Sequence, residues 1–132
     1  MDHTRIFSSF ANEEGVSIVG YVGIGAEQYP VYKIIRGRGK KQIFLSAVVH
    51  GEEPAGMYAI SEFLSKFISK YEQDFTFTIF PCVNPWGLFH NARGNAQGIN
   101  LNREFKKIPI CSDIGHIIRE LVQILHDLRI VF

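Results

Sequence analysis

Apolar and polar positions follow one another in blocks along the chain, and the first blocks predict β-strands. Two runs rich in β-branched and aromatic residues, Val16 to Gly25 and Tyr29 to Arg36, are bounded by glycine, proline or charge. Two such runs separated by a few residues are typical of a β-hairpin. The next run, Gln42 to Val49, is almost continuously apolar. This pattern indicates a strand buried on both faces, as in the interior of a parallel sheet.

A helix is predicted between this strand and the next one. After Pro54, apolar residues recur every three or four positions, the spacing of one buried helix face; they are Met57, Ile60, Phe63, Leu64, Phe67 and Ile68. Proline fits the first turn of a helix because its missing N–H needs no partner there. The apolar run from Phe75 to Val83 predicts a second buried strand. The three elements form a β-α-β unit, for which we expect a right-handed crossover.

The rest of the chain contains an irregular segment followed by another helix. Residues 84–105 are rich in asparagine and glycine and have neither a helical nor an alternating period. A structureless connection of roughly 20 residues inside a compact domain is usually functional. Helical spacing then predicts a second amphipathic helix, whose apolar face consists of Ile114, Ile117, Ile118, Leu121, Leu125 and Leu128. The last four residues, 129–132, read as the beginning of a strand.

Length and composition limit the architecture and the class of function. A chain of 132 residues forms one domain at most, and 46% hydrophobic residues exclude a disordered chain. The net charge of +1 offers no basic surface for nucleic acid or anionic lipid. Cys82 and Cys111 form no Cys-x-x-Cys pair, so we expect buried free thiols. No signal peptide or membrane span is visible, and we expect a soluble, cytoplasmic protein.

His50 and Glu53 are the first candidates for chemistry. They follow the predicted strand 42–49 at its carboxyl end, where open α/β sheets place their ligands. The spacing can aim an imidazole nitrogen and a carboxylate at one point, and zinc accepts both at about 2.0–2.2 Å. A simpler interpretation also fits: Glu52 and Glu53 complement the positive end of a helix dipole, and His50 is an ordinary loop residue. Taken alone, these residues favour the simpler interpretation.

Arg93 and Arg103 stand among asparagines in the irregular segment. A guanidinium offers two parallel donors to a carboxylate, and a neighbouring asparagine adds an orienting donor. This composition suits the binding of an anion and a carbonyl group rather than a cation. For a single arginine, a solvated charge in a loop of Asx turns is the more common explanation.

Together, the two groups of residues resemble the motifs of the zinc carboxypeptidase family. The matching segments are HGEEPAG at 50–56, NPWG at 84–87, Arg93-x-Asn95 and GINLNREF at 98–105, in the family's order. The resemblance spans about residues 16–105 and is strongest to the compact bacterial members, which include murein-peptide amidases. It implies the α/β class: the N-terminal part of a zinc-carboxypeptidase-like (phosphorylase/hydrolase-like) fold, with a mixed, mostly buried β-sheet flanked by helices and the site at strand carboxyl ends.

The resemblance also implies roles for individual residues. His50 and Glu53 would be two of the three protein ligands of Zn²⁺. Arg93 would polarise the scissile carbonyl and stabilise its oxyanion, and Asn102 and Arg103 would hold the free C-terminal carboxylate of a peptide substrate. The implied function is hydrolysis of the C-terminal peptide bond of peptides, cell-wall peptides among them, by zinc-activated water with a glutamate as general base.

Three residues depart from the family's pattern. Glu52 stands where the pancreatic-type enzymes carry arginine, although acidic residues are usual there in bacterial members. Asn100 replaces an aspartate, and we expect weaker support for Asn102 and Arg103. Glu104 replaces an asparagine, and we expect its negative charge to weaken the binding of an anionic substrate.

The family's third zinc ligand, a histidine, and its general-base glutamate both belong beyond the helix that ends near Leu128. We therefore expect residues 1–132 to be a single, incomplete domain that has little or no peptidase activity alone. His116 and His126 fall on the polar or boundary side of the last helix, and we expect both to be solvated. His90 lies in the irregular segment, without a spacing that favours a ligand role.

Two other functions stay open. N-acyl amino acid deacylases of the succinylglutamate desuccinylase and aspartoacylase group share the His-x-x-Glu and Asn-Arg elements. The NPWG turn at 84–87 and the Arg93-x-Asn95 spacing resemble the peptidases more closely. The third possibility is a catalytically inactive truncated homologue.

Overall fold

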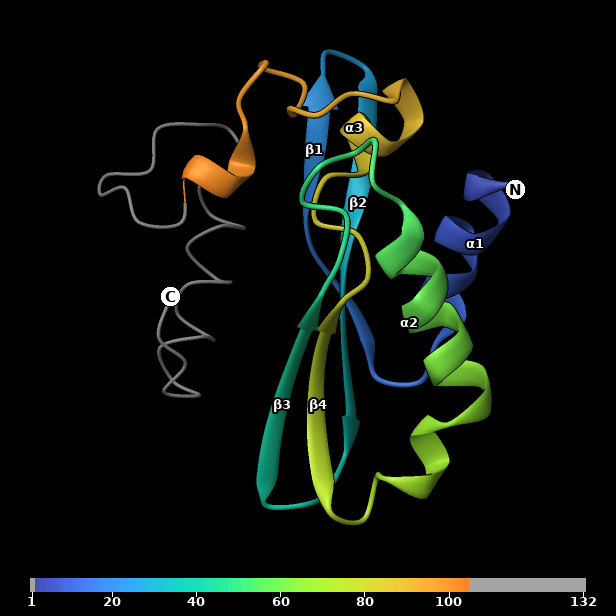
Figure 1. Ribbon diagram of the computed structural model, residues 1–132. Coiled ribbons are helices and arrows are strands. Elements are labelled where there is room, and N and C mark those ends of the chain that lie inside the picture. Colours follow the sequence, from blue (N-terminus) through green and yellow to red (C-terminus); the bar gives the residue numbers. More distant parts are fainter. Residues whose placement is uncertain (1, 105–132) are drawn as a thin grey trace.

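The structure, a computed structural model of the protein, describes residues 2–104 and contains a four-stranded mixed sheet with helices packed against it. The strands are β1 (Val16–Ile24), β2 (Glu27–Gly37), β3 (Lys41–Ser46) and β4 (Phe75–Phe80), in the spatial order β1-β2-β4-β3 (Figure 1). β1 pairs with β2 and β2 with β4 in antiparallel fashion, whereas β3 and β4 are parallel. The predicted α/β class and both strand pairs are therefore confirmed.

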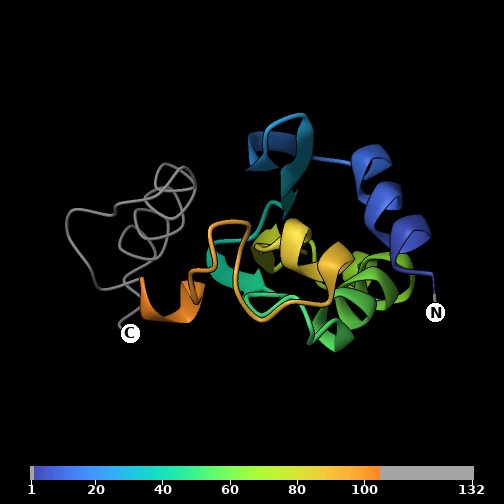
Figure 2. The same cartoon turned by 90° about the horizontal axis from the view of Figure 1, so that it is seen from above.

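Helices α1 (His3–Ser9) and α2 (Ala55–Lys66) lie on the same side of the sheet (Figures 1 and 2). α2 begins directly after Pro54 and buries Met57, Ile60 and Leu64, as the spacing predicts. Phe67, predicted on the same buried face, is 43% exposed because the helix ends at Lys66 and Phe67 is its C-cap residue. It connects the parallel strands β3 and β4, which completes the predicted β-α-β unit. A short 3-10 helix, η2 (Ile68–Lys70), follows α2.

Helix α1 was not expected from the pattern of apolar residues. Asp2 caps this helix by accepting a hydrogen bond from the Arg5 backbone N–H at 3.2 Å. α1 and the following 3-10 helix η1 (Phe10–Asn12) bury Phe7 and Phe10. The signal was an N-cap residue followed by apolar residues at helical spacing, in a segment too short for a clear period.

The hydrophobic core has two parts, one on each face of the sheet. The larger part lies between the sheet and the helices α1 and α2, and includes Ile34, Met57 and Ile79. The smaller part, on the opposite face, consists of Val22, Val31, Phe80, Val83 and Leu101. Leu101 comes from the 3-10 helix η3 (Leu101–Arg103), which lies across the sheet from α2 (Figure 1). The irregular segment 84–104 is therefore fixed to the sheet by a buried side chain.

β3 differs from the prediction of a strand buried on both faces. Among the described residues it pairs with β4 alone, and none of its six residues is fully buried. β4 has neighbours on both sides, and its last four residues are buried. The apolar pattern of β3 identified a strand correctly, but it did not reveal the position of that strand in the sheet.

The predicted helix over residues 114–128 and the strand beginning at 129–132 lie outside the described residues. No helix in the described part of the chain has the length and apolar character that a membrane crossing requires.

Candidate functional site

The carboxyl ends of β3 and β4 hold the candidate site, at the upper end of both strands in Figure 1. Backbone hydrogen bonds continue past the strands: Ala47 N–H donates to Phe80 O at 3.0 Å, and Asn84 N–H donates to Val48 O at 2.9 Å. Val48 has a φ of 56°. This left-handed conformation is a genuine outlier for a β-branched residue, and such strain gathers at functional sites. The chain thus leaves β3 through a constrained backbone immediately before His50.

The segments after β3 and β4 touch through their backbones. A Cβ added to Gly51 would lie 2.0 Å from the carbonyl carbon of Gly87, so neither segment has room for a side chain at Gly51. Gly87 belongs to α3 (Pro85–His90), a six-residue helix within the segment 84–105 that was predicted to be irregular. The signal for α3 was the Asn84-Pro85 pair, because asparagine is a favoured N-cap and proline a favoured first helical residue.

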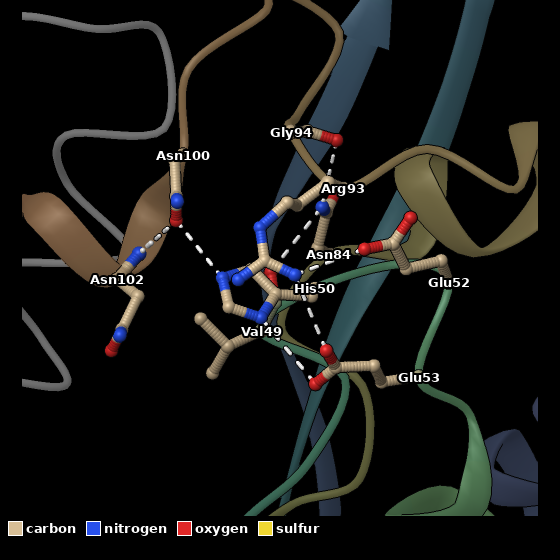
Figure 3. A network of polar contacts seen from close by, with 9 residues as sticks. All are labelled: Val49, His50, Glu52, Glu53, Asn84, Arg93, Gly94, Asn100 and Asn102. Atoms are coloured by element: carbon tan, nitrogen blue, oxygen red, sulfur yellow. Dashed lines mark hydrogen bonds and ion pairs between the residues drawn. The ribbon is translucent and has the colours of Figure 1, made fainter.

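Asn84 connects three parts of the site and is only 1% exposed. Its Oδ1 accepts from Gly87 N–H at 3.0 Å and caps α3. Its Nδ2 donates to Gly94 O at 2.9 Å and to Val49 O at 3.4 Å. One buried side chain therefore fixes the loop that carries Arg93 against the turn that carries His50 (Figure 3).

His50 contacts Glu53 through one ring nitrogen and Asn100 through the other (Figure 3). Nδ1 lies 3.4 Å from Glu53 Oε2, and Nε2 lies 3.0 Å from Asn100 Oδ1. Asn100 Oδ1 also accepts the backbone N–H of Asn102 at 3.1 Å. A backbone N–H can only donate, so this atom is an oxygen, and His50 Nε2 must carry the proton that it accepts.

This hydrogen bond determines what His50 Nδ1 can do. A neutral imidazole with its proton on Nε2 presents a lone pair at Nδ1, which faces the Glu53 carboxylate 3.4 Å away. Two lone pairs at that distance repel each other unless a cation, a second proton or a metal ion, lies between them. Histidines that bind a metal commonly donate their other ring N–H to an oxygen atom in this way.

The separation of the two atoms fits zinc. A tetrahedral zinc ion with bonds of about 2.0–2.1 Å keeps two ligand atoms about 3.3 Å apart, and His50 Nδ1 and Glu53 Oε2 are 3.4 Å apart. Imidazole nitrogen and carboxylate oxygen are also donors that zinc accepts. Within residues 2–104, no group of three or more His, Cys, Asp or Glu side chains could hold a metal ion.

Arg93 lies between two carboxylates next to His50. Its Nη1 donates to Glu52 Oε1 at 2.9 Å and to Glu53 Oε1 at 3.3 Å. The hydrogen bond to Glu52 is the main cause that raises the pKa of Arg93, and Glu53 adds to it. The Arg93 side chain is 51% exposed. Arg93 is therefore a solvent-exposed loop residue that is paired with both carboxylates.

Asn95 has a structural position. It is 3% exposed, and its Oδ1 accepts the backbone N–H groups of Gln97 and Ile99 at 3.0 and 2.9 Å. These bonds form an Asx-type turn that shapes the loop after Arg93. The Arg93-x-Asn95 spacing thus combines a residue that faces the site with a residue that builds the loop.

Asn102 and Arg103 are exposed on η3, next to Asn100. Asn100 holds both backbones, because its Oδ1 accepts from Asn102 N–H and its backbone oxygen accepts from Arg103 N–H at 3.0 Å. Asn100 therefore joins the His50 ring to the segment predicted to bind a carboxylate. Glu104 is buried, with 8% exposure, whereas its two predecessors face solvent.

His90 is paired with the β1–β2 hairpin. Its Nε2 lies 2.6 Å from Glu27 Oε1, and its ring stacks on Trp86 with centroids 4.1 Å apart. Tyr29 donates to the same oxygen at 2.6 Å, and this bond, followed by that of His90, lowers the pKa of Glu27. The same bond raises the pKa of Tyr29 to about 12. These contacts tie α3 to the hairpin.

Cys82 is a buried free thiol, as predicted, and burial raises its pKa. His116, His126 and Cys111 lie outside the described residues. A hollow of about 350 Å³ opens beside Arg38 and Glu72, at the opposite end of the sheet, and contains none of the predicted site residues.

Comparisons with known proteins found one matching family and several similar solved structures. A sequence model of a family described as zinc carboxypeptidase matches residues 15–119. The fold is similar to a protein of Shewanella amazonensis SB2B described as a candidate metallopeptidase, with a TM-score of 0.73 and 27% identity over 94% of this chain and 51% of that one. No curated protein sequence matches the chain.

Two further solved structures share the fold at lower identity. A metallo-carboxypeptidase from Pseudomonas aeruginosa, in complex with (2-guanidinoethylmercapto)succinic acid, has a TM-score of 0.64 and 18% identity over 97% of this chain and 36% of that one. An aspartoacylase family protein from Mesorhizobium loti has a TM-score of 0.62 and 24% identity over 89% and 38%. The chain thus spans about half of the Shewanella protein and little more than a third of these two.

Proposed function

Because the chain belongs to the zinc carboxypeptidase family, we propose that the whole protein is a zinc-dependent metallocarboxypeptidase that hydrolyses the C-terminal peptide bond of peptides. The match over residues 15–119 includes every residue named in the site. The observation that carries the proposal is the orientation of His50, whose protonated Nε2 is held by Asn100 while its Nδ1 faces Glu53.

His50 and Glu53 would bind Zn²⁺ through Nδ1 and the carboxylate. When bound, zinc supplies a Lewis acid and lowers the pKa of its water to about 7. The separation of 3.4 Å between Nδ1 and Oε2 supports this assignment. We predict that a histidine outside the described residues is the third ligand, and that a glutamate outside them is the general base.

Substrate binding would use the exposed arginines. Asn102 and Arg103 would hold the free carboxylate of the terminal residue, because a guanidinium offers paired donors and both residues face solvent beside His50. Arg93 would stabilise the negative oxygen that develops on the scissile carbonyl. Its hydrogen bonds to Glu52 and Glu53 place the guanidinium next to the proposed metal ligand before any substrate arrives.

Carboxypeptidase activity is measured on the protein as it is encoded, including any residues that follow Phe132. With ZnCl₂ present, we expect release of the last residue from a peptide with a free C-terminus and none from the same peptide with an amidated C-terminus. The Arg103→Ala variant should raise KM more than it lowers kcat. Equal cleavage of the free and amidated peptides would contradict the proposed role of the carboxylate.

A second candidate is hydrolysis of N-acyl amino acids, in which the free amino-acid carboxylate would occupy the same arginines. The structural similarity to an aspartoacylase family protein, at a TM-score of 0.62, favours testing it. The same preparation should be offered N-succinylglutamate and N-acetylaspartate at matched concentrations. Faster turnover of these compounds than of any dipeptide would replace the first candidate with the second.

A further inference from the structure

Glu52 and Glu53 both accept a hydrogen bond from Arg93, but only Glu53 also contacts His50. Glu53 directs Oε2 toward His50 Nδ1 and Oε1 toward Arg93, at 3.4 and 3.3 Å. Glu52 binds the same guanidinium nitrogen at the shorter distance of 2.9 Å. We propose that Glu52 is a positioning residue, which holds Arg93 and thereby limits the competition of Arg93 with the metal for Glu53. This inference rests on the proposed zinc site.

The competition follows from the chemistry of a carboxylate. Glu53 has two oxygens, and electron density that one of them gives to a guanidinium is less available to a metal on the other. Arg93 is therefore a rival cation at Glu53, although catalysis requires it nearby. A second carboxylate reduces this competition. Arg93 Nη1 donates its shorter hydrogen bond, of 2.9 Å, to Glu52, and its hydrogen bond to Glu53 is therefore weaker than it would be without Glu52.

The residues carrying this arrangement are exposed enough to be replaced without disturbing the core. The side chains of Glu52, Glu53 and Arg93 are 40%, 62% and 51% exposed. The higher pKa of Arg93, caused mainly by the Glu52 hydrogen bond, agrees with Glu52 as the stronger partner. Exposure also limits the effect: ion pairs of this kind change an equilibrium by up to about fivefold.

The experiment measures zinc affinity on the protein as it is encoded, including any residues that follow Phe132. ZnCl₂ is titrated into ¹⁵N-labelled protein at constant pH, and the ring nitrogens of His50 report binding. We compare the wild type, Glu52→Gln, Arg93→Gln and the double variant. Glu52→Gln leaves Arg93 to Glu53 alone, and we expect zinc to bind about three- to fivefold more weakly. Arg93→Gln removes the rival cation, and we expect binding about two- to fivefold tighter.

The double variant separates this mechanism from simple attraction between Glu52 and the metal. If Glu52 attracts the metal directly through its charge, Glu52→Gln weakens zinc binding even when Arg93 is absent. If Glu52 acts by holding Arg93, Glu52→Gln has no such effect once Arg93 is replaced. In the Arg93→Gln background, we expect Glu52→Gln to weaken zinc binding by about twofold or less, since exposed charges are screened. Glu62→Gln is the matched control, because Glu62 is an exposed residue of α2 paired with Lys66 at 2.6 Å, and its loss should leave zinc binding unchanged.

Each outcome has a distinct meaning. If Glu52→Gln weakens zinc binding equally with and without Arg93, or if Arg93→Gln does not tighten it, the positioning role of Glu52 is wrong while the zinc site stands. If the wild type shows no saturable zinc-dependent shift at His50, the proposed zinc site itself fails, and the inference with it. Circular dichroism of each variant verifies that the fold is retained.

Discussion

Replacing Asn100 by alanine is expected to weaken zinc binding and to destabilise the fold by similar free energies. Asn100 Oδ1 accepts hydrogen bonds from His50 Nε2 at 3.0 Å and from Asn102 N–H at 3.1 Å. Each is worth about 0.5–1.5 kcal/mol net, so losing both should reduce the free energy of unfolding by about 1–3 kcal/mol. Removal of the partner that orients a metal-binding histidine typically lowers metal affinity by about 10- to 100-fold.

Two measurements on the same protein separate these effects. Urea unfolding gives the stability of the fold, and competition with a chromophoric chelator gives the zinc affinity. Asn100→Asp keeps the oxygen atom that accepts both hydrogen bonds. It also adds a negative charge, so this variant should bind zinc at least as tightly as the wild type. Asn12→Ala is the control, because Asn12 is an exposed residue of η1 near the N-terminus, and its replacement should change neither zinc affinity nor stability by a similar amount.

The result that would refute this reasoning is specific. If Asn100→Ala binds zinc as tightly as the wild type while it lowers stability by the predicted amount, Asn100 only supports η3. The orientation of His50 would then have another cause. If Asn100→Asp binds zinc more weakly than Asn100→Ala, the direction of the electrostatic argument is wrong.

Three further predictions concern the framework of the site. Gly51→Ala places a Cβ against the Gly87 backbone and should lower stability by about 2 kcal/mol or more in thermal unfolding. Gly56→Ala, whose nearest contact would be the Ala47 Cβ at 2.8 Å, should cost less. Asn84→Ala removes the α3 cap and leaves Gly94 O without its donor, so urea unfolding should show a loss of roughly 2–4 kcal/mol. Cys82 should react with a thiol reagent only after denaturation, because burial raises its pKa; rapid labelling of native Cys82, seen by mass spectrometry, would contradict its burial.

The sequence was most informative where the chemistry is local. Val16 to Arg36 form a hairpin and Pro54 precedes a helix because side-chain period and backbone restriction act within a few residues. His50 and Glu53 could likewise be predicted to converge, since only one turn separates them. Short elements escaped detection: α3 has six residues, fewer than two helical turns, and its period does not stand out from the surrounding asparagines.

Contacts across the fold could not be predicted in the same way. The pairing of Arg93 with Glu52 and of His50 with Asn100 joins residues 41 and 50 positions apart. Such contacts depend on the register of β3 against β4 and on the buried Asn84 amide that draws the Arg93 loop inward. The edge position of β3 also depends on sheet order, which an apolar pattern does not encode.

The central claim is that His50 and Glu53 hold a zinc ion, and anomalous diffraction at the zinc edge tests it most directly. Crystals of the protein as encoded, grown with ZnCl₂, should show an anomalous peak about 2.0–2.2 Å from His50 Nδ1 and from a Glu53 carboxylate oxygen. His50 Nε2 should still donate to Asn100. A zinc peak on Nε2, or a well-ordered site in which zinc binds elsewhere and leaves His50 and Glu53 paired with each other, would contradict the account.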